Sequence, residues 1–94
     1  MNKTILKQAI KTFGATHQKL KAVEELTELS LLIQHDIKNP QKLLDIAQEI
    51  ADVEIMIAQL KMMYFFENRI EEAKKFKIER LKKRIEERRS LNET

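Results

Sequence analysis

The chain contains very few residues that favour turns, and this scarcity limits its fold more than any other feature. Its 94 residues include one Gly and one Pro. Strands are usually joined by turns rich in Gly, Pro, Asn or Asp. A chain that is 43% hydrophobic and so poor in turn formers is therefore expected to form a few long helices. Its length fits a single domain over residues 1–94.

Apolar residues recur at helical spacing in four segments. The predicted helices cover residues 3–13, 17–37, 40–64 and 69–89, and residues 90–94 are expected to fray. The second helix carries the apolar residues Leu20, Val23, Leu26, Leu29, Leu32 and Ile33. The third has a continuous apolar stripe of Leu43, Ile46, Ala47, Ile50, Val53, Ile57 and Leu60. On the fourth, the residues expected to face inward are Ile70, Ala73, Phe76, Ile78, Leu81 and Ile85.

The boundaries between these helices have recognisable signals. Gly14 is expected to end the first helix, because it accepts a left-handed backbone, and Thr16 is expected to cap the second. Pro40 separates the second helix from the third, since the residue before a proline avoids the helical region. A capping box of Asn68 and Glu71 is expected to begin the fourth helix.

Short connections between amphipathic helices favour a bundle of antiparallel neighbours. The second and third helices should therefore form an antiparallel hairpin within an all-α fold of four helices. Apolar residues cover more than half the circumference of the third helix, which is more than the neighbours in one small chain can cover. This pattern predicts an obligate oligomer, because obligate interfaces resemble a core cut in half.

Composition narrows the range of functions. The chain has no Cys, which excludes disulfides, thiolate metal sites and a cysteine nucleophile. Neither a signal peptide nor an apolar run of membrane-spanning length is visible, so we expect a cytoplasmic protein without membrane contact. From residue 67 to residue 94 there are ten Lys or Arg and seven Glu, which accounts for the whole net charge of +3. A basic segment suits an anionic partner, and its ordinary alternative is a solvated helix face.

Carboxylates lie within two of the apolar stretches. Glu25 and Glu28 are three residues apart, as are Glu49 and Asp52, so each pair shares one helix face. Burying such charges is unfavourable unless they are paired or bind a metal, and Mg²⁺ prefers carboxylate oxygens. Two such pairs on facing antiparallel helices could hold one or two ions.

Solvated helix faces are the competing interpretation of these acids. On a helical wheel Glu49 and Asp52 fall outside the widest apolar arc of their helix. Glu54 falls near the centre of that arc, beside Ile50 and Ile57. The wheel alone therefore favours exposed side chains for Glu49 and Asp52.

The two acidic motifs together resemble a known signature. The sequences EELTE at residues 24–28 and EIAD at residues 49–52 resemble the EExxE…ExxD pattern of MazG-type, all-α nucleotide pyrophosphohydrolases. The resemblance covers roughly residues 17–81 and is closest to short MazG-like proteins of phages and their bacterial hosts. It implies a four-helix fold assembled as a homodimer or as a dimer of dimers.

The resemblance also implies a reaction and a set of residues. Glu25, Glu28, Glu49 and Asp52 match the ligands of Mg²⁺, for which Mn²⁺ is an alternative. The implied reaction cleaves a nucleoside triphosphate between its α and β phosphates, giving a nucleoside monophosphate and pyrophosphate. Glu24, or one of the ligand glutamates, would be the base that activates water.

A basic motif on the last helix is implied to contact phosphate. Lys77 and Arg80 match it loosely, since other members space the two residues differently. The competing function is a non-catalytic helical module that uses this basic helix to bind nucleic acid or a partner helix. Interleaved glutamates, among them Glu79, Glu86 and Glu87, disfavour the nucleic-acid version.

Overall fold

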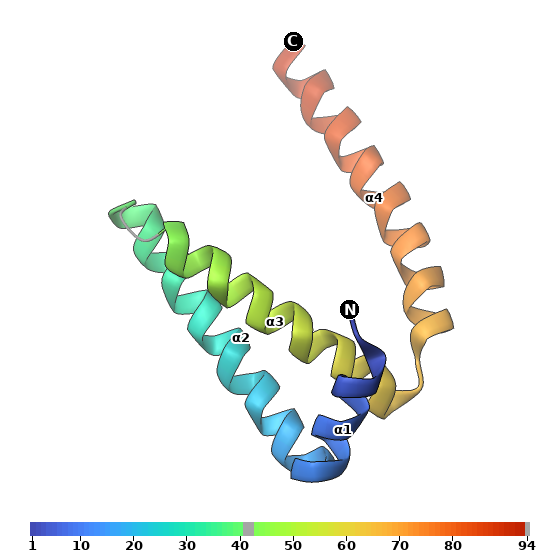
Figure 1. Cartoon of the computed structure of the whole chain (residues 1–94). Coiled ribbons are helices and arrows are strands. Elements are labelled where there is room, and N and C mark those ends of the chain that lie inside the picture. The colour runs from blue at the N-terminus through green and yellow to red at the C-terminus, as the bar shows by residue number, and fades with distance from the viewer. Residues whose placement is uncertain (41–42, 94) are drawn as a thin grey trace.

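The computed structural model describes residues 1–40 and 43–93 of the chain. These residues form four helices, α1 (Lys3–Phe13), α2 (Ala15–Lys38), α3 (Leu43–Tyr64) and α4 (Glu67–Glu93), and contain no strand (Figure 1). The predicted all-α class with four helices is therefore confirmed. Pro40 precedes α3 rather than beginning it, and residues 41 and 42 of the predicted third helix lie outside the described residues.

Local hydrogen bonds fix both ends of α1. The Asn2 side chain accepts hydrogen bonds from the backbone N–H groups of Thr4 and Ile5, at 2.9 and 3.4 Å. Gly14 has a φ of 91° and donates its N–H to the Ile10 carbonyl at 2.8 Å, as expected for a residue that ends a helix. The helix α2 begins directly after Gly14, so the prediction that Thr16 caps it is wrong.

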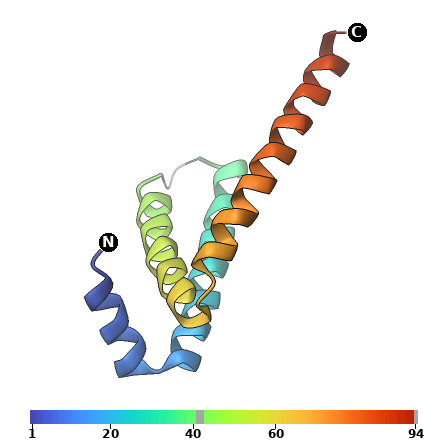
Figure 2. The ribbon, with the colours of Figure 1, turned by 90° about the vertical axis from the view of Figure 1, so that its right-hand side faces the viewer.

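The helices α2 and α3 run antiparallel and lie side by side, which confirms the predicted hairpin (Figures 1 and 2). Asn39 ends α2 with an extended φ of −154°, and its N–H reaches the His35 carbonyl at 2.8 Å. That extended backbone is the conformation imposed on a residue before proline. The short helix α1 packs against both long helices at the opposite end of the hairpin.

The interior of the hairpin is largely polar, contrary to expectation. The buried residues of α2 and α3 are Gln18, Ala22, Glu25, Glu49, Val53, Met56 and Gln59. By contrast Leu20, Val23 and Leu26 on α2 are exposed, and so are Ile50 and Ile57 on α3. Within one chain, these members of the apolar stripes of α2 and α3 therefore point away from the interior of the hairpin.

The helix α4 begins earlier and ends later than predicted. Asn68 lies inside α4, and the Ile70 N–H bonds to the Phe66 carbonyl at 2.8 Å, so no capping box forms at Asn68. Residues 90–93 are helical, and Thr94 lies outside the described residues.

Within the single chain α4 extends away from the other three helices (Figures 1 and 2). The side chains of Phe76, Ile78, Leu81 and Ile85 are exposed, so the prediction that they face inward is wrong for the single chain. The radius of gyration is 17.3 Å, whereas a compact domain of this length has about 12 Å. None of the helices, within the described residues, has a stretch both long and apolar enough to cross a bilayer.

Candidate metal centre

Glu25 of α2 and Glu49 of α3 meet in the interior of the hairpin. They are only 8% and 7% exposed. Helical spacing explains their position, because Gln18, Ala22 and Glu25 share one face of α2 at intervals of four and three residues. The face of α3 that packs against them carries Glu49, Val53 and Met56 at the same intervals.

Five acids form a connected group around Glu25. Carboxylate oxygens of Glu25, Glu49 and Asp52 lie within 4.8 Å of one another. Oxygens of Glu24, Glu25 and Glu28 meet the same limit. Glu25 belongs to both sets, so the two helices present their sequence motifs to a common region. The structure thus brings together all five acids that the sequence singled out.

Two oxygens in this group are buried without a partner. With both carboxylates ionised, the Oε2 atoms of Glu25 and Glu49 have no hydrogen-bond partner among the described residues. Lys21 offers partial compensation, since its Nζ lies 3.3 Å from Glu25 Oε1 and 3.4 Å from Glu24 Oε1. The hydrogen bond to Glu25, with the charge of Glu24, raises the pKa of Lys21. One ammonium group cannot neutralise five carboxylates.

Proton sharing relieves part of this repulsion. The pKa of Glu49 is raised to about 8. The largest cause is its hydrogen bond with Glu25, and burial and a hydrogen bond with Glu28 add to the effect. The hydrogen bond with Glu49 lowers the pKa of Glu25, and Lys21 adds to this effect, although burial opposes it. At neutral pH Glu49 is therefore mostly protonated and Glu25 ionised when no cation is bound.

The helical wheel misplaced two of the acids on α3. Glu49 is buried, although it lies outside the apolar arc, and Glu54, near the centre of that arc, is exposed. Asp52 is exposed, as the helical wheel predicted. One of its carboxylate oxygens nevertheless lies within 4.8 Å of carboxylate oxygens of Glu25 and Glu49. The wheel failed for Glu49 and Glu54 because it assumes that the widest apolar face is the buried one.

A buried amide pair extends the polar interior, and the sequence reasoning did not identify it. Gln18 Nε2 donates a hydrogen bond of 2.8 Å to Gln59 Oε1, and both side chains are buried. Each glutamine lies seven positions from a motif acid, Gln18 before Glu25 and Gln59 after Asp52. Seven positions are almost two full turns of a helix, so each glutamine lies on the same helix face as its motif acid. That shared face is the sequence signal that could have identified this pair.

The two basic residues predicted to contact phosphate lie elsewhere. Lys77 and Arg80 are exposed on α4, three positions apart. Because α4 extends away from the hairpin, these cations belong to a different part of the single chain from the carboxylates (Figure 1). Comparison of the chain with protein-family models, with characterised proteins and with solved structures finds no match.

Proposed function

We propose that the chain is a magnesium-dependent nucleoside triphosphate pyrophosphohydrolase that yields a nucleoside monophosphate and pyrophosphate. The observation that carries this proposal is the pair of buried carboxylates, Glu25 and Glu49, whose Oε2 atoms have no partner among the described residues. Structural carboxylates in a protein interior are normally paired. Two buried carboxylates that only a shared proton can satisfy in the metal-free chain are better explained by a cation site.

The donor set fits Mg²⁺, and Mn²⁺ as an alternative. All candidate ligand atoms are carboxylate oxygens, which are hard donors and suit both ions. Glu25, Glu28, Glu49 and Asp52 would hold the ion, with Glu25 shared between the two acid clusters. When bound, the ion would neutralise phosphate charge and lower the pKa of an attacking water.

Glu24 is the candidate base, although one of the ligand glutamates could also act. Its side chain is exposed, and its one hydrogen bond among the described residues comes from Lys21. A carboxylate at the edge of the cluster can accept a proton from a water that approaches from solvent. Lys21 would hold Glu24 and Glu25 in position through its contacts with both.

The α4 cations would reach the substrate in an assembly of copies. Lys77 and Arg80 share one face of α4 and would act as fixed positive charges for the triphosphate. Their separation from the hairpin in one chain supports a homodimer or homotetramer, in which α4 of one copy approaches the carboxylates of another. Exposed apolar side chains on α2, α3 and α4 support the same conclusion.

Pyrophosphate release from a panel of nucleoside triphosphates tests the proposal. We expect release with Mg²⁺ or Mn²⁺ and none with EDTA. Glu49→Gln should reduce the rate by roughly 100-fold or more, whereas Glu54→Gln, an exposed acid on the same helix, should change it little. Absence of release from every nucleotide with either metal would refute the proposed activity.

A non-catalytic binding module is the second candidate, and the exposed α4 favours it. This helix of 27 residues presents ten Lys or Arg and has little contact with the rest of the chain. Fluorescence anisotropy with labelled oligonucleotides distinguishes the two functions. Specific binding that is lost on charge reversal at Lys82 and Lys83, in a protein without hydrolysis, would favour the module.

A further inference from the structure

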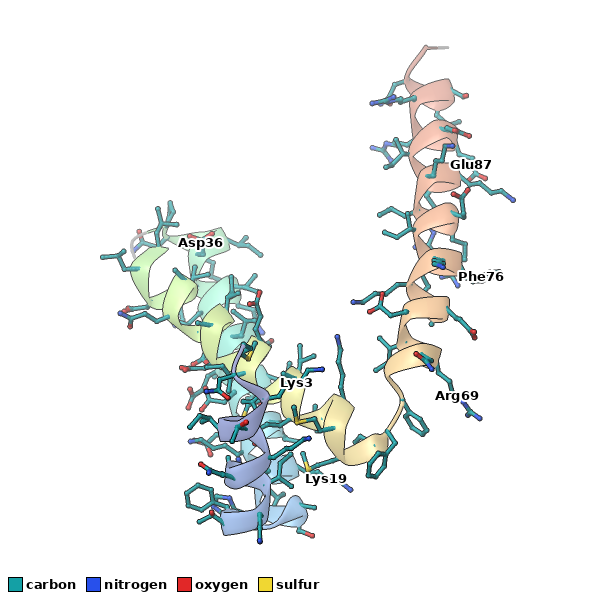
Figure 3. The ribbon with its side chains drawn as sticks, turned by 45° about the vertical axis from the view of Figure 1, so that its right-hand side comes forward. Lys3, Lys19, Asp36, Arg69, Phe76 and Glu87 are labelled. Atoms are coloured by element: carbon teal, nitrogen blue, oxygen red, sulfur yellow. The ribbon has the colours of Figure 1, made fainter. Side chains whose placement is uncertain are left out.

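A second charged site lies at the end of the hairpin where α1 and the start of α4 approach it. A cavity of about 940 Å³ opens there, between residues of all four helices. Figure 3 shows Lys19 and Arg69 near this junction, whereas Asp36 lies at the opposite end of α2. The cationic residues that line the cavity are Lys3, Lys7, Lys11, Lys19, Lys61 and Arg69.

These cations converge because of helical spacing and chain topology. Lys3, Lys7 and Lys11 are four residues apart, so they follow one face of α1. None of the six cations forms an ion pair with a carboxylate of the described residues, and no described carboxylate lines the cavity. Six neighbouring positive charges with no counterion among the described side chains make the cavity a site of positive potential.

Apolar side chains complete the lining. Ile10, Met62 and Met63 contribute to the wall, together with Phe65. Phe65 ends α3 in a left-handed conformation with a φ of 56°, and its side chain is 90% exposed. A bulky residue with positive φ is strained. Here the strained turn holds an aromatic ring beside the cluster of cations.

We propose that this cavity binds a small organic polyphosphate that carries a flat ring. The cations suit linked phosphates, and Phe65 with the two methionines suits a ring. The volume falls within the range of small-molecule sites, about 300–1,000 Å³. A compact ligand of this class fits both the size of the cavity and its two kinds of lining.

This site is distinct from the carboxylate centre. The two share no residue. Lys61 lies nine positions after Asp52, which is roughly 13 Å along α3. Ligands at the cavity are held by side chains rather than through a metal, so binding persists in EDTA. The inference therefore does not depend on the proposed hydrolysis.

Isothermal titration calorimetry in EDTA at physiological salt tests the cavity, with ATP, inorganic triphosphate and adenosine as probes. We expect ATP to bind most tightly, triphosphate more weakly and adenosine not measurably. Lys7→Gln with Lys11→Gln should weaken ATP and triphosphate by at least about tenfold. The matched control is Lys82→Gln with Lys83→Gln, which removes two exposed charges from α4 and should leave both affinities unchanged.

A second variant tests the ring. Phe65→Ala should weaken ATP by roughly fivefold or more and leave inorganic triphosphate unaffected. Circular dichroism confirms that each variant keeps its helices. Equal losses in the cavity variant and the α4 variant would overturn the proposal, since they would indicate non-specific charge attraction. Affinity that increases steadily with oligonucleotide length, with no binding of ATP, would also overturn it in favour of nucleic acid.

The outcome is separable from that of the proposed function. Glu49→Gln should abolish hydrolysis and retain ATP binding in EDTA. Loss of that binding in Glu49→Gln would place the nucleotide at the carboxylate centre and remove the second site. Binding at the cavity in a protein that never releases pyrophosphate would support the site and refute the enzyme.

Discussion

The proton shared by Glu25 and Glu49 couples the stability of the metal-free protein to pH. Folding raises the pKa of Glu49 from 4.5 to about 8. Between these values the folded protein retains a proton that the unfolded chain releases. We therefore expect the free energy of unfolding to fall as pH rises from about 4.5 to about 8, by at most about 1.4 kcal/mol per pH unit for one proton.

Denaturant titrations in EDTA across this range measure the effect. Glu49→Gln should flatten the slope, because glutamine does not titrate, and Glu54→Gln should preserve it. The lowered pKa of Glu25 acts with the opposite sign and at lower pH, since its contribution is lost as pH falls below about 4.5. A slope that is identical in wild type and Glu49→Gln would assign the pH dependence to other groups.

The same carboxylates predict how Mg²⁺ affects stability. Metal that binds only the folded protein should stabilise it by about 2.7 kcal/mol at a concentration 100 times the dissociation constant. Replacing a ligand charge, with Glu28→Gln or Asp52→Asn, should shrink this gain. Each variant should be at least as stable as wild type in EDTA, because a repelling charge has been removed.

Thermal melts with Mg²⁺ and with EDTA distinguish this behaviour from a structural role. If Glu28 and Asp52 serve the fold alone, their substitution destabilises the protein in EDTA and Mg²⁺ has little effect on any variant. A full magnesium shift in both variants would show that these two carboxylates do not bind the metal.

At the scale of the helix pair, the buried amides should contribute to pairing specificity as well as stability. Gln18 and Gln59 form the buried cross-helix hydrogen bond of the hairpin, at 2.8 Å. Gln59→Ala would leave the Nε2 donor of Gln18 buried without its partner, although Gln18 Oε1 keeps its contact with His17 Nδ1, at a cost of about 1–3 kcal/mol. Replacing both glutamines by leucine should be much less harmful, since no unpaired polar group remains.

A double-mutant cycle measured by urea denaturation tests this coupling. Gln18→Leu alone and Gln59→Leu alone should each lose more stability than the double variant that combines them. Additive losses would indicate that the two amides act independently, for example through water.

The sequence predicted the elements better than their buried faces. The range of α1 and the role of Gly14 followed from periodicity and from the freedom of glycine to adopt positive φ. The burial of Glu49 did not follow, because hydrophobic periodicity identifies an apolar face without saying what covers it. The acidic motifs were recognised by the spacing of their residues along the chain, and this spacing is the same whichever helix face is buried. In the proposed assembly, the relation of Lys77 and Arg80 to the carboxylates would depend on packing between copies, which no local pattern encodes.

At the scale of the whole molecule, the single chain leaves much of its apolar surface exposed. Its buried apolar residues are Leu6, Ala22, Val53 and Met56, whereas many larger apolar side chains are exposed on α2, α3 and α4. Within the described residues, one chain therefore buries only a small apolar core, as expected if copies associate. Association of copies would bury these apolar faces and retain the polar hairpin interior as a site.

An assembly in which α4 serves a neighbouring copy makes a testable prediction about mixed subunits. A Glu49→Gln copy lacks a working carboxylate centre but keeps its α4 cations. A copy with Lys77→Ala and Arg80→Ala has the reverse defect. Each variant alone should release little pyrophosphate. Co-refolding equal amounts should restore about a quarter of wild-type activity, because half of the dimers are mixed and each mixed dimer has one intact site of two.

This recovery separates action between copies from action within one chain. If α4 folds back onto its own hairpin in solution, every mixed site still contains one defect and mixing restores nothing. The control mixes Glu49→Gln with Glu28→Gln, two defects in the same carboxylate centre, and should give no recovery in either arrangement. Light scattering on the mixture confirms that subunits associate. Recovery with the α4 variant and not with the control would establish that one copy supplies the carboxylates and its neighbour the phosphate-binding cations.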